Sequence, residues 1–186
     1  MTNSKRELAN FIKGDKQGLS PIFLRRKDMN GVIQAIQEQE LALTSNTASL
    51  PFNVVDLRTA SAINCRGWLN HNEGSALFSI LEGGVYEITF NTNVTSNTAG
   101  QVALALFADG VQVPGTEMDA VIAAPGDFEN VGFDKKIRVC CKGTVNLSIN
   151  SLPTITYNGG ADPIVTDTQI PIVKNSNVNV ERLSGN

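Results

Sequence analysis

The clearest pattern of hydrophobic and polar positions runs through residues 75–113, on both sides of the pair Gly83-Gly84. Apolar residues recur there at every second position, which predicts strands that bury one face. The pair Asp109-Gly110 interrupts the alternation, and this dipeptide is typical of a two-residue hairpin turn. The region therefore predicts antiparallel sheet. The alternating apolar positions are Ala76, Phe78, Ile80, Tyr86, Ile88, Phe90, Val102, Leu104 and Leu106.

Further strand-like segments follow one another at short intervals from residue 51 to the end of the chain. Gly, Asn and Pro separate them, and no helical pattern lies between them, so parallel α/β folds with crossover helices are excluded. We expect an all-β, double-sheet jelly-roll sandwich. Residues 151–174, rich in Pro and Gly, predict a long excursion before the last strand. The expected strands are 52–57, 66–70, 75–81, 85–94, 102–108, 118–123, 131–141, 144–149 and 178–183.

The chain divides near residue 50 into two expected regions, an N-terminal arm with a short helix (residues 1–50) and the jelly-roll domain (residues 51–186). Pro21 disfavours helix in the residue ahead of it, so this part of the arm is expected to be extended. An apolar cluster followed by three cations has the composition of a docking peptide. Its residues are Ile22, Phe23, Leu24, Arg25, Arg26 and Lys27.

A helix is expected after this peptide, with Asp28 or Asn30 as its N-cap. Val32, Ile33, Ile36 and Leu43 recur at roughly helical spacing, opposite a face of Gln and Glu. Residues 44–49 are polar and predict a linker. The alternative is a solvated tail followed by one surface helix.

Charge is distributed unevenly along the 186 residues, whose formal net charge is -3. Residues 1–30 hold seven Lys and Arg against three Asp and Glu, a net charge of +4, so the remainder is acidic. Aromatic residues are not interleaved with these cations, which argues against a nucleic-acid partner. The N-terminus lacks the apolar core of a signal peptide, and no segment is long enough to span a membrane. We therefore expect synthesis and assembly in a cytoplasm.

Residues that could support catalysis or metal binding are sparse. The three cysteines, Cys65, Cys140 and Cys141, predict reduced thiols rather than a disulfide framework. The single histidine, His71, is interpreted as an incidental loop residue, and no nucleophile elbow, phosphate loop or dinucleotide motif is present. We therefore expect no enzyme activity, cofactor or metal. A group of acidic residues that does not follow the spacing of a calcium loop comprises Asp119, Asp127, Glu129 and Asp134.

One motif resembles a known family. Gly84, Tyr86 and Phe90 match a Gly-x-Tyr-x-x-x-Phe strand, and the next alternating strand ends in Asp109-Gly110. This arrangement resembles the tumour necrosis factor-like jelly roll, which includes complement globular heads, over about residues 51–183. The resemblance implies a compact homotrimer that packs around a threefold axis through aromatic and aliphatic residues. It leaves open which residues face that axis.

The Asn-, Thr- and Val-rich composition looks like the trimeric domains encoded by bacteria and their tailed phages. Heads on bacterial filaments normally follow Gly-X-Y repeats, and none occurs in this sequence. The resemblance therefore implies a homotrimeric head fiber or capsid decoration protein on the virion surface. Its arm would bind the major capsid protein or another virion protein through residues 22–27. Ile33 and Ile36 would make helix contacts within the trimer or with the shell.

Two other functions stay open. A receptor- or glycan-binding module of a tail fiber, baseplate or filament tip would use outer loops at residues 91–100 and 153–163, where Tyr157 could stack on a host-surface sugar. A hydrolase on a sandwich scaffold would need a clustered acidic pair, which the sequence does not reveal.

Overall fold

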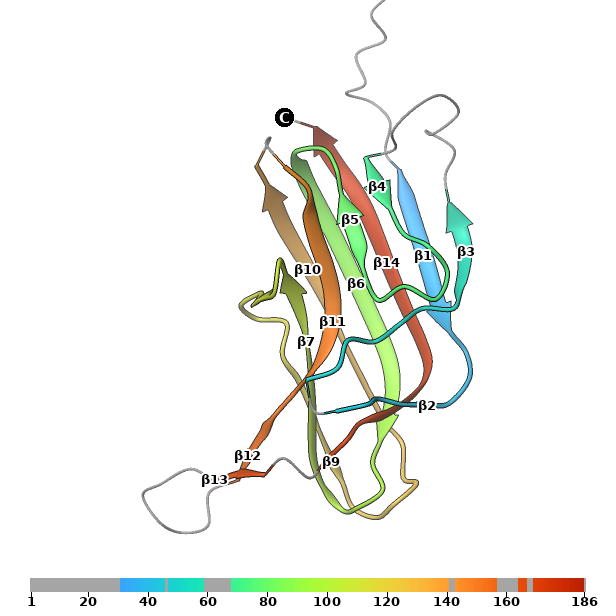
Figure 1. Cartoon of the computed structure of the whole chain (residues 1–186), viewed down its shortest axis with the longest axis vertical. Helices are drawn as coiled ribbons and strands as arrows, with labels where there is room; N and C mark the ends of the chain where they lie inside the picture. Colours follow the sequence, from blue (N-terminus) through green and yellow to red (C-terminus); the bar gives the residue numbers. More distant parts are fainter. Residues whose placement is uncertain are drawn as a thin grey trace, which may run out of the picture.

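The computed structural model describes residues 31–45, 47–58, 68–140, 143–156, 164–166 and 169–185. Strands are the regular elements of these ranges, and the described part of the chain contains no helix. The strands form two antiparallel sheets that pack face to face (Figure 1). The prediction of an all-β sandwich is confirmed.

The first sheet, called sheet 1 here, has six strands. β14 lies in its middle, between β6 and β1, and β10 and β3 are the edges of the main strand order. A further short strand, β2, pairs with the start of β14. In spatial order the strands are β10 (Glu129–Val139), β6 (Gly84–Thr95), β14 (Ile172–Gly185), β1 (Val32–Gln37) and β3 (Val54–Arg58), with β2 (Leu41–Ala42) beside β14.

Sheet 2 covers the inner face of sheet 1 and also has six strands. β11 and β7 form its centre, and β9 pairs with the first half of β7. In spatial order the strands are β4 (Leu69–Asn70), β5 (Phe78–Ile80), β11 (Val145–Leu152), β7 (Gly100–Ala108) and β8 (Val111–Gln112), with β9 (Met118–Ile122) beside β7. A separate pair, β12 (Thr154–Thr156) and β13 (Ile164–Thr166), extends from the sandwich (Figure 1).

The predicted alternation defines the core. Tyr86, Ile88 and Phe90 of β6 are fully buried, whereas the residues between them are half-buried or exposed. Phe78 and Ile80 of β5 are buried in the same core cluster. Each strand therefore gives one face to the core and one to the surface, and burial of these side chains is the main driving force for closing the sandwich.

Two turns of the predicted region connect different elements. β5 and β6 belong to different sheets, so the Gly83-Gly84 corner carries the chain from sheet 2 to sheet 1. The Asp109-Gly110 hairpin is confirmed, because Ala108 pairs with Val111 and the two turn residues have φ of 49° and 80°. These angles fit a type I′ turn, whose twist suits adjacent antiparallel strands.

The expected helix is wrong. Residues 32–37 form β1, which pairs with β14 on one side and with β3 on the other. Ile33 and Ala35 point into the core, and Leu43, beyond β2, is buried as well. Pairing on both edges satisfies the backbone of this segment and overrides its helical spacing. The sheet therefore includes residues on both sides of the division expected at residue 50.

The last strand begins at Ile172, earlier than expected, and contains a β-bulge. Lys174 pairs with Asn93 and Asn177 pairs with Asn91, so two residues of β14 lie opposite Thr92 alone. Asn175 has a positive φ of 52°, a conformation that Asn tolerates better than most residues. The bulge shifts the alternation, and Val173 and Ser176 both become buried.

β1 begins and β14 ends at the same end of the sandwich, because Val32 pairs with Glu181 (Figure 1). The connection between β6 and β7, at residues 96–99, lies at the opposite end. Gly31, the residue before β1, therefore lies at the end that carries the C-terminus of β14.

Candidate functional site: the outer face of sheet 1

The residues predicted to anchor the chain, Ile22, Phe23, Leu24, Arg25, Arg26 and Lys27, lie outside the described residues. Their role stays a prediction. The loop residue Tyr157 also lies outside the described residues, as do Cys65 and Cys141.

Ile33 and Ile36 are described, and they have different environments. Ile33 is 3% exposed and packs in the core of its own chain, where it is not accessible to another subunit. Ile36 is half-buried and belongs to the outward positions of β1. A contact made by a helix is excluded for both residues, since they lie on a strand.

The motif residues Gly84, Tyr86 and Phe90 have structural roles. The Tyr86 hydroxyl donates a hydrogen bond of 2.6 Å to the backbone carbonyl of Glu82. Burial raises the pKa of Tyr86 to about 12, although the nearby Arg182 acts to lower this pKa and Glu82 acts to raise it. Tyr86 is therefore a neutral core residue that holds the Gly83-Gly84 corner against β6.

Arg182 completes a polar cluster at this end of the sandwich. Its guanidinium donates to the Glu82 carboxylate at 2.9 Å and to the Gly83 carbonyl at 2.8 Å. Its backbone N–H donates to the carbonyl of Gly31 at 3.0 Å. A Cβ on Gly31 would lie 2.3 Å from the Trp68 ring, and this ring is 5.5 Å from that of Tyr86. The cluster joins the starting point of β1 to the end of β14.

His71 lies in the connection that follows β4, as expected, but it is buried in the core, which was not predicted. It is 1% exposed and stacks on Phe78, with the ring centroids 4.0 Å apart and an interplanar angle of 6°. Its Nδ1 lies 2.9 Å from the Leu77 carbonyl, which can only accept, so Nδ1 donates. The imidazole packs with the Phe side chains beneath β4 and β5.

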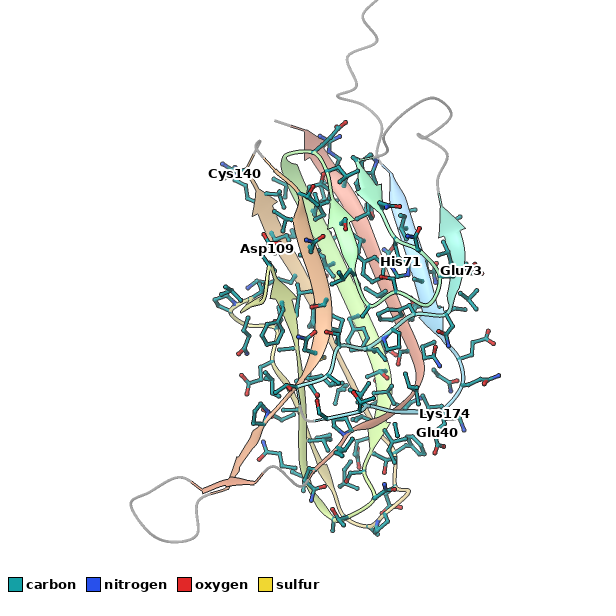
Figure 2. The ribbon with its side chains drawn as sticks, in the orientation of Figure 1. Glu40, His71, Glu73, Asp109, Cys140 and Lys174 are labelled. Carbon is teal, nitrogen blue, oxygen red and sulfur yellow. The ribbon has the colours of Figure 1, made fainter. Side chains whose placement is uncertain are left out.

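Metal-binding side chains do not gather into a cluster in the described part of the chain. No group of three or more His, Cys, Asp and Glu there could hold a metal ion. Cys140 is exposed just beyond the end of β10, and Asp109 lies at the hairpin turn that follows β7 (Figure 2). The Asp109 carboxylate accepts the backbone N–H of Asn146 at 2.9 Å, which supports the turn. Within the described ranges, no helix has the length and apolar character that a membrane span needs.

The outer face of sheet 1 carries the most distinctive set of surface residues. Cross-strand pairing places Gln34 beside Asn179 and Asn179 beside Thr89. The next row places Asn177 beside Asn91. We call these five residues the amide strip, after the four amide side chains that dominate it. The strip crosses the three central strands β1, β14 and β6.

The amide strip lines a groove of about 580 Å³. Val32 and Leu57 complete the lining, so one border of the groove is apolar. Leu57 and Val54 on the edge strand β3 are 44% and 41% exposed. No side-chain hydrogen bond within the described residues engages the four amide groups. The groove thus combines unused hydrogen-bonding capacity with accessible apolar surface.

Charged residues on this face lie outside the strip. Lys136 of β10 is 3.1 Å from Glu87 of β6. Glu87 is also paired in register with Glu181 of β14, one row away from Gln34 and Asn179. Asp134 lies beside Thr89, toward the edge at β10. The centre of the face is therefore neutral, and these charged groups lie in the next row and toward the β10 edge.

The amide strip was not predicted from the sequence. The relevant signal is the alternation of Asn177 and Asn179 with Val178 and Val180, and the position of Asn91 directly after Phe90. The signal becomes informative only with the strand register, because the strip combines three distant parts of the chain.

Comparison with known proteins identifies structural likeness without sequence likeness. No protein-family model matches the sequence, and no curated protein matches it. The globular domain of zebrafish complement 1qA protein has a TM-score of 0.56 and 10% identity, covering 85% of this chain and 100% of that domain. Murine APRIL at pH 8.5 has a TM-score of 0.50 and 8% identity, covering 83% of this chain and 100% of that chain.

These identities establish the fold alone. The two sheets described above are the layers of that fold, and the motif residues Tyr86 and Phe90 lie in its core. The chain therefore has the jelly-roll fold of the complement globular head and APRIL.

Proposed function

We propose that this chain is a non-enzymatic, homotrimeric structural protein of a tailed-phage virion, a head fiber or capsid decoration protein. Three sandwiches would associate through the outer face of sheet 1. Three N-terminal arms would bind the major capsid protein or another virion protein on the capsid surface. The basic composition of residues 1–30 and the arm's apolar docking peptide support this proposal.

The observation that carries the proposal is the position of Gly31 at one end of the sandwich, where β1 starts beside the end of β14 (Figure 1). A threefold axis relates equivalent points of the three subunits, so all three arms would leave the trimer at this same end. Simultaneous binding by three arms raises avidity by roughly 10²-fold or more over one arm, provided that the geometry allows it.

The subunit interface is proposed from the surface of sheet 1. Leu57 leaves apolar area accessible at one border of the groove, and Val54 on the same edge strand is also exposed. Burial of such area on association is favourable in proportion to its extent. The face is also continuous over five strands, so it offers a broad surface to a neighbouring subunit.

A full-length charge-reversal variant tests the anchoring. Arg25→Glu, Arg26→Glu and Lys27→Glu together should weaken binding to capsids of the parent phage by about 10²-fold, since each trimer loses three contacts at once. Binding is measured by co-sedimentation. The matched control is Lys5→Glu, Arg6→Glu and Lys13→Glu, which changes the arm's charge equally but leaves residues 22–27 intact. Equal loss in the two variants would show non-specific charge attraction and contradict the anchoring role.

A truncated chain that starts at residue 51 would be a poor test of the anchoring role. This truncation removes β1, so that β14 and β3 lose the strand that pairs with both of them, and it also removes β2. A truncation that retains the sandwich starts at Gly31.

A second candidate function is host-surface glycan binding, at the end opposite the arm attachment. Phe128 is 38% exposed there, and the Lys174 ammonium lies over one face of its ring, 5.7 Å from the centroid, so a sugar would stack on the other face. An accessible aromatic ring beside a hydrogen-bond donor is the kind of platform on which a sugar can stack. Binding of the full-length trimer to a glycan array, abolished by Phe128→Ala, would favour this function. Retained binding in that variant would place the sugar elsewhere.

A further inference from the structure

The neutral centre of sheet 1 suggests how three copies of this chain meet, and this step rests on the proposed trimer. At a threefold axis, each residue near the axis faces its own copies. A charged residue would therefore face two like charges, which is unfavourable. An amide group both donates and accepts, so three identical amides can form a closed ring of hydrogen bonds.

The described residues fit this requirement. The amide strip occupies the middle of the face, while Glu87, Glu181 and Asp134 lie in the next row and toward the β10 edge. Gln34, Asn177 and Asn179 are already half-buried in the single chain. Their side chains have no hydrogen-bond partner among the described residues, so their donors and acceptors are available to another subunit.

We propose that the amide strip forms a hydrogen-bonded polar core at the threefold axis of the homotrimer, with Val54 and Leu57 packing at its border. The occupant of the groove is thus a second copy of this chain. This differs from the aromatic and aliphatic contacts that the family resemblance implies. Neutral amides in a buried interface also fix the alignment of the subunits, because a shift of one subunit against another would leave the amides without hydrogen-bond partners.

Replacing one amide by the carboxylate of the same shape tests the proposal in the full-length chain. Asn179→Asp puts three like charges near the axis at pH 8. We expect the protein concentration for half-dissociation of the trimer to rise by about tenfold or more, since juxtaposed like charges are costly. The measurement is sedimentation velocity over a dilution series. Trimer formation by the variant should recover at pH 4, where side-chain carboxyls are substantially protonated.

The matched control is Asn97→Asp, which makes the same chemical change on the exposed connection between β6 and β7. Circular dichroism of both variants checks that they are folded. Asn91→Asp serves as the second test variant, so the result does not depend on one position.

The outcomes separate this inference from the proposed function. The polar core is supported if the wild type and Asn97→Asp are trimeric at pH 8 while both test variants dissociate. The polar core is overturned, but the trimer is not, if Asn179→Asp and Asn91→Asp form trimers as stable as that of the wild type. A monomeric wild type at all concentrations overturns both. If a glycan occupies the groove instead, the two test variants lose glycan binding without dissociating, which also overturns the inference.

Discussion

The inner and outer faces of sheet 1 are built from the same strands and have different chemical properties. On β6, Ile88 and Phe90 fill the core, whereas Thr89 and Asn91 line the outer groove. On β14, Val178 and Val180 are buried, and Asn177 and Asn179 alternate with them. Because the side chains of a strand alternate between its two faces, the same strand contributes an apolar inner face and a polar outer face. Changes on the inner face should affect folding, and changes on the outer face should affect association.

The largest expected effect on stability comes from comparing an inner-face and an outer-face residue of the same strand, β6. Phe90→Ala should lower the free energy of unfolding by about 3–5 kcal/mol, because it removes a fully buried ring from the core. Its neighbour Asn91 points outward, so Asn91→Ala should change monomer stability by less than about 0.5 kcal/mol. Urea unfolding at several protein concentrations separates folding from association. Similar losses of monomer stability for the two variants would contradict the assignment of the faces.

A smaller effect is expected where the inner face is polar. The hydroxyls of Thr92 and Ser176 are buried and 2.7 Å apart, opposite the bulge in β14. Thr92→Val leaves the Ser176 hydroxyl without this partner and should cost about 1–3 kcal/mol. The double variant with Ser176→Ala should cost less than the sum of the two single variants. Additive costs in the double-mutant cycle would show that the two hydroxyls do not interact.

The smallest effect at neutral pH concerns Tyr86. Tyr86→Phe removes the hydrogen bond to the Glu82 carbonyl and should cost about 1 kcal/mol. The unfolded phenol ionises near its ordinary pKa of about 10. In the folded chain burial raises this pKa to about 12, so the unfolded state binds fewer protons between these values. Wild-type stability should therefore fall as the pH rises above about 10.

The measurement is the urea midpoint of wild type and Tyr86→Phe between pH 9 and 11. Lys residues titrate in the same range, so the informative quantity is the difference between the two proteins. Wild type should lose more stability than the variant. A constant difference across this range would show that ionisation of Tyr86 is not linked to unfolding.

Sequence patterns predicted most clearly the strands whose inward positions are large and apolar. β6 is the clearest case, since Tyr86, Ile88 and Phe90 mark its buried face directly. β1 was predicted as a helix because two of its three buried positions are Ala35 and Gln37, which conceal the alternation. Ala and Gln are also good helix formers, and only pairing with β14 and β3 overrides that preference.

The beginning of β14 was missed for a different reason. The bulge at Asn175 interrupts the alternation, so residues 172–177 do not show period two. The outer face was harder still to predict. Its groove depends on which strands are neighbours and in which register, and local sequence does not determine either. Gln34, Asn91 and Asn179 become one surface only when residues far apart in the chain pair.

The position of β1 between two antiparallel neighbours has a mechanical consequence. When the sandwich is held at its opposite end, a pulling force applied at Gly31 acts along β1, nearly perpendicular to the hydrogen bonds that join this strand to β14 and β3. In this direction the two ladders are sheared together, so their bonds share the force and do not open one after another. The sandwich is therefore built to resist extension from the very point at which the N-terminal arm leaves it.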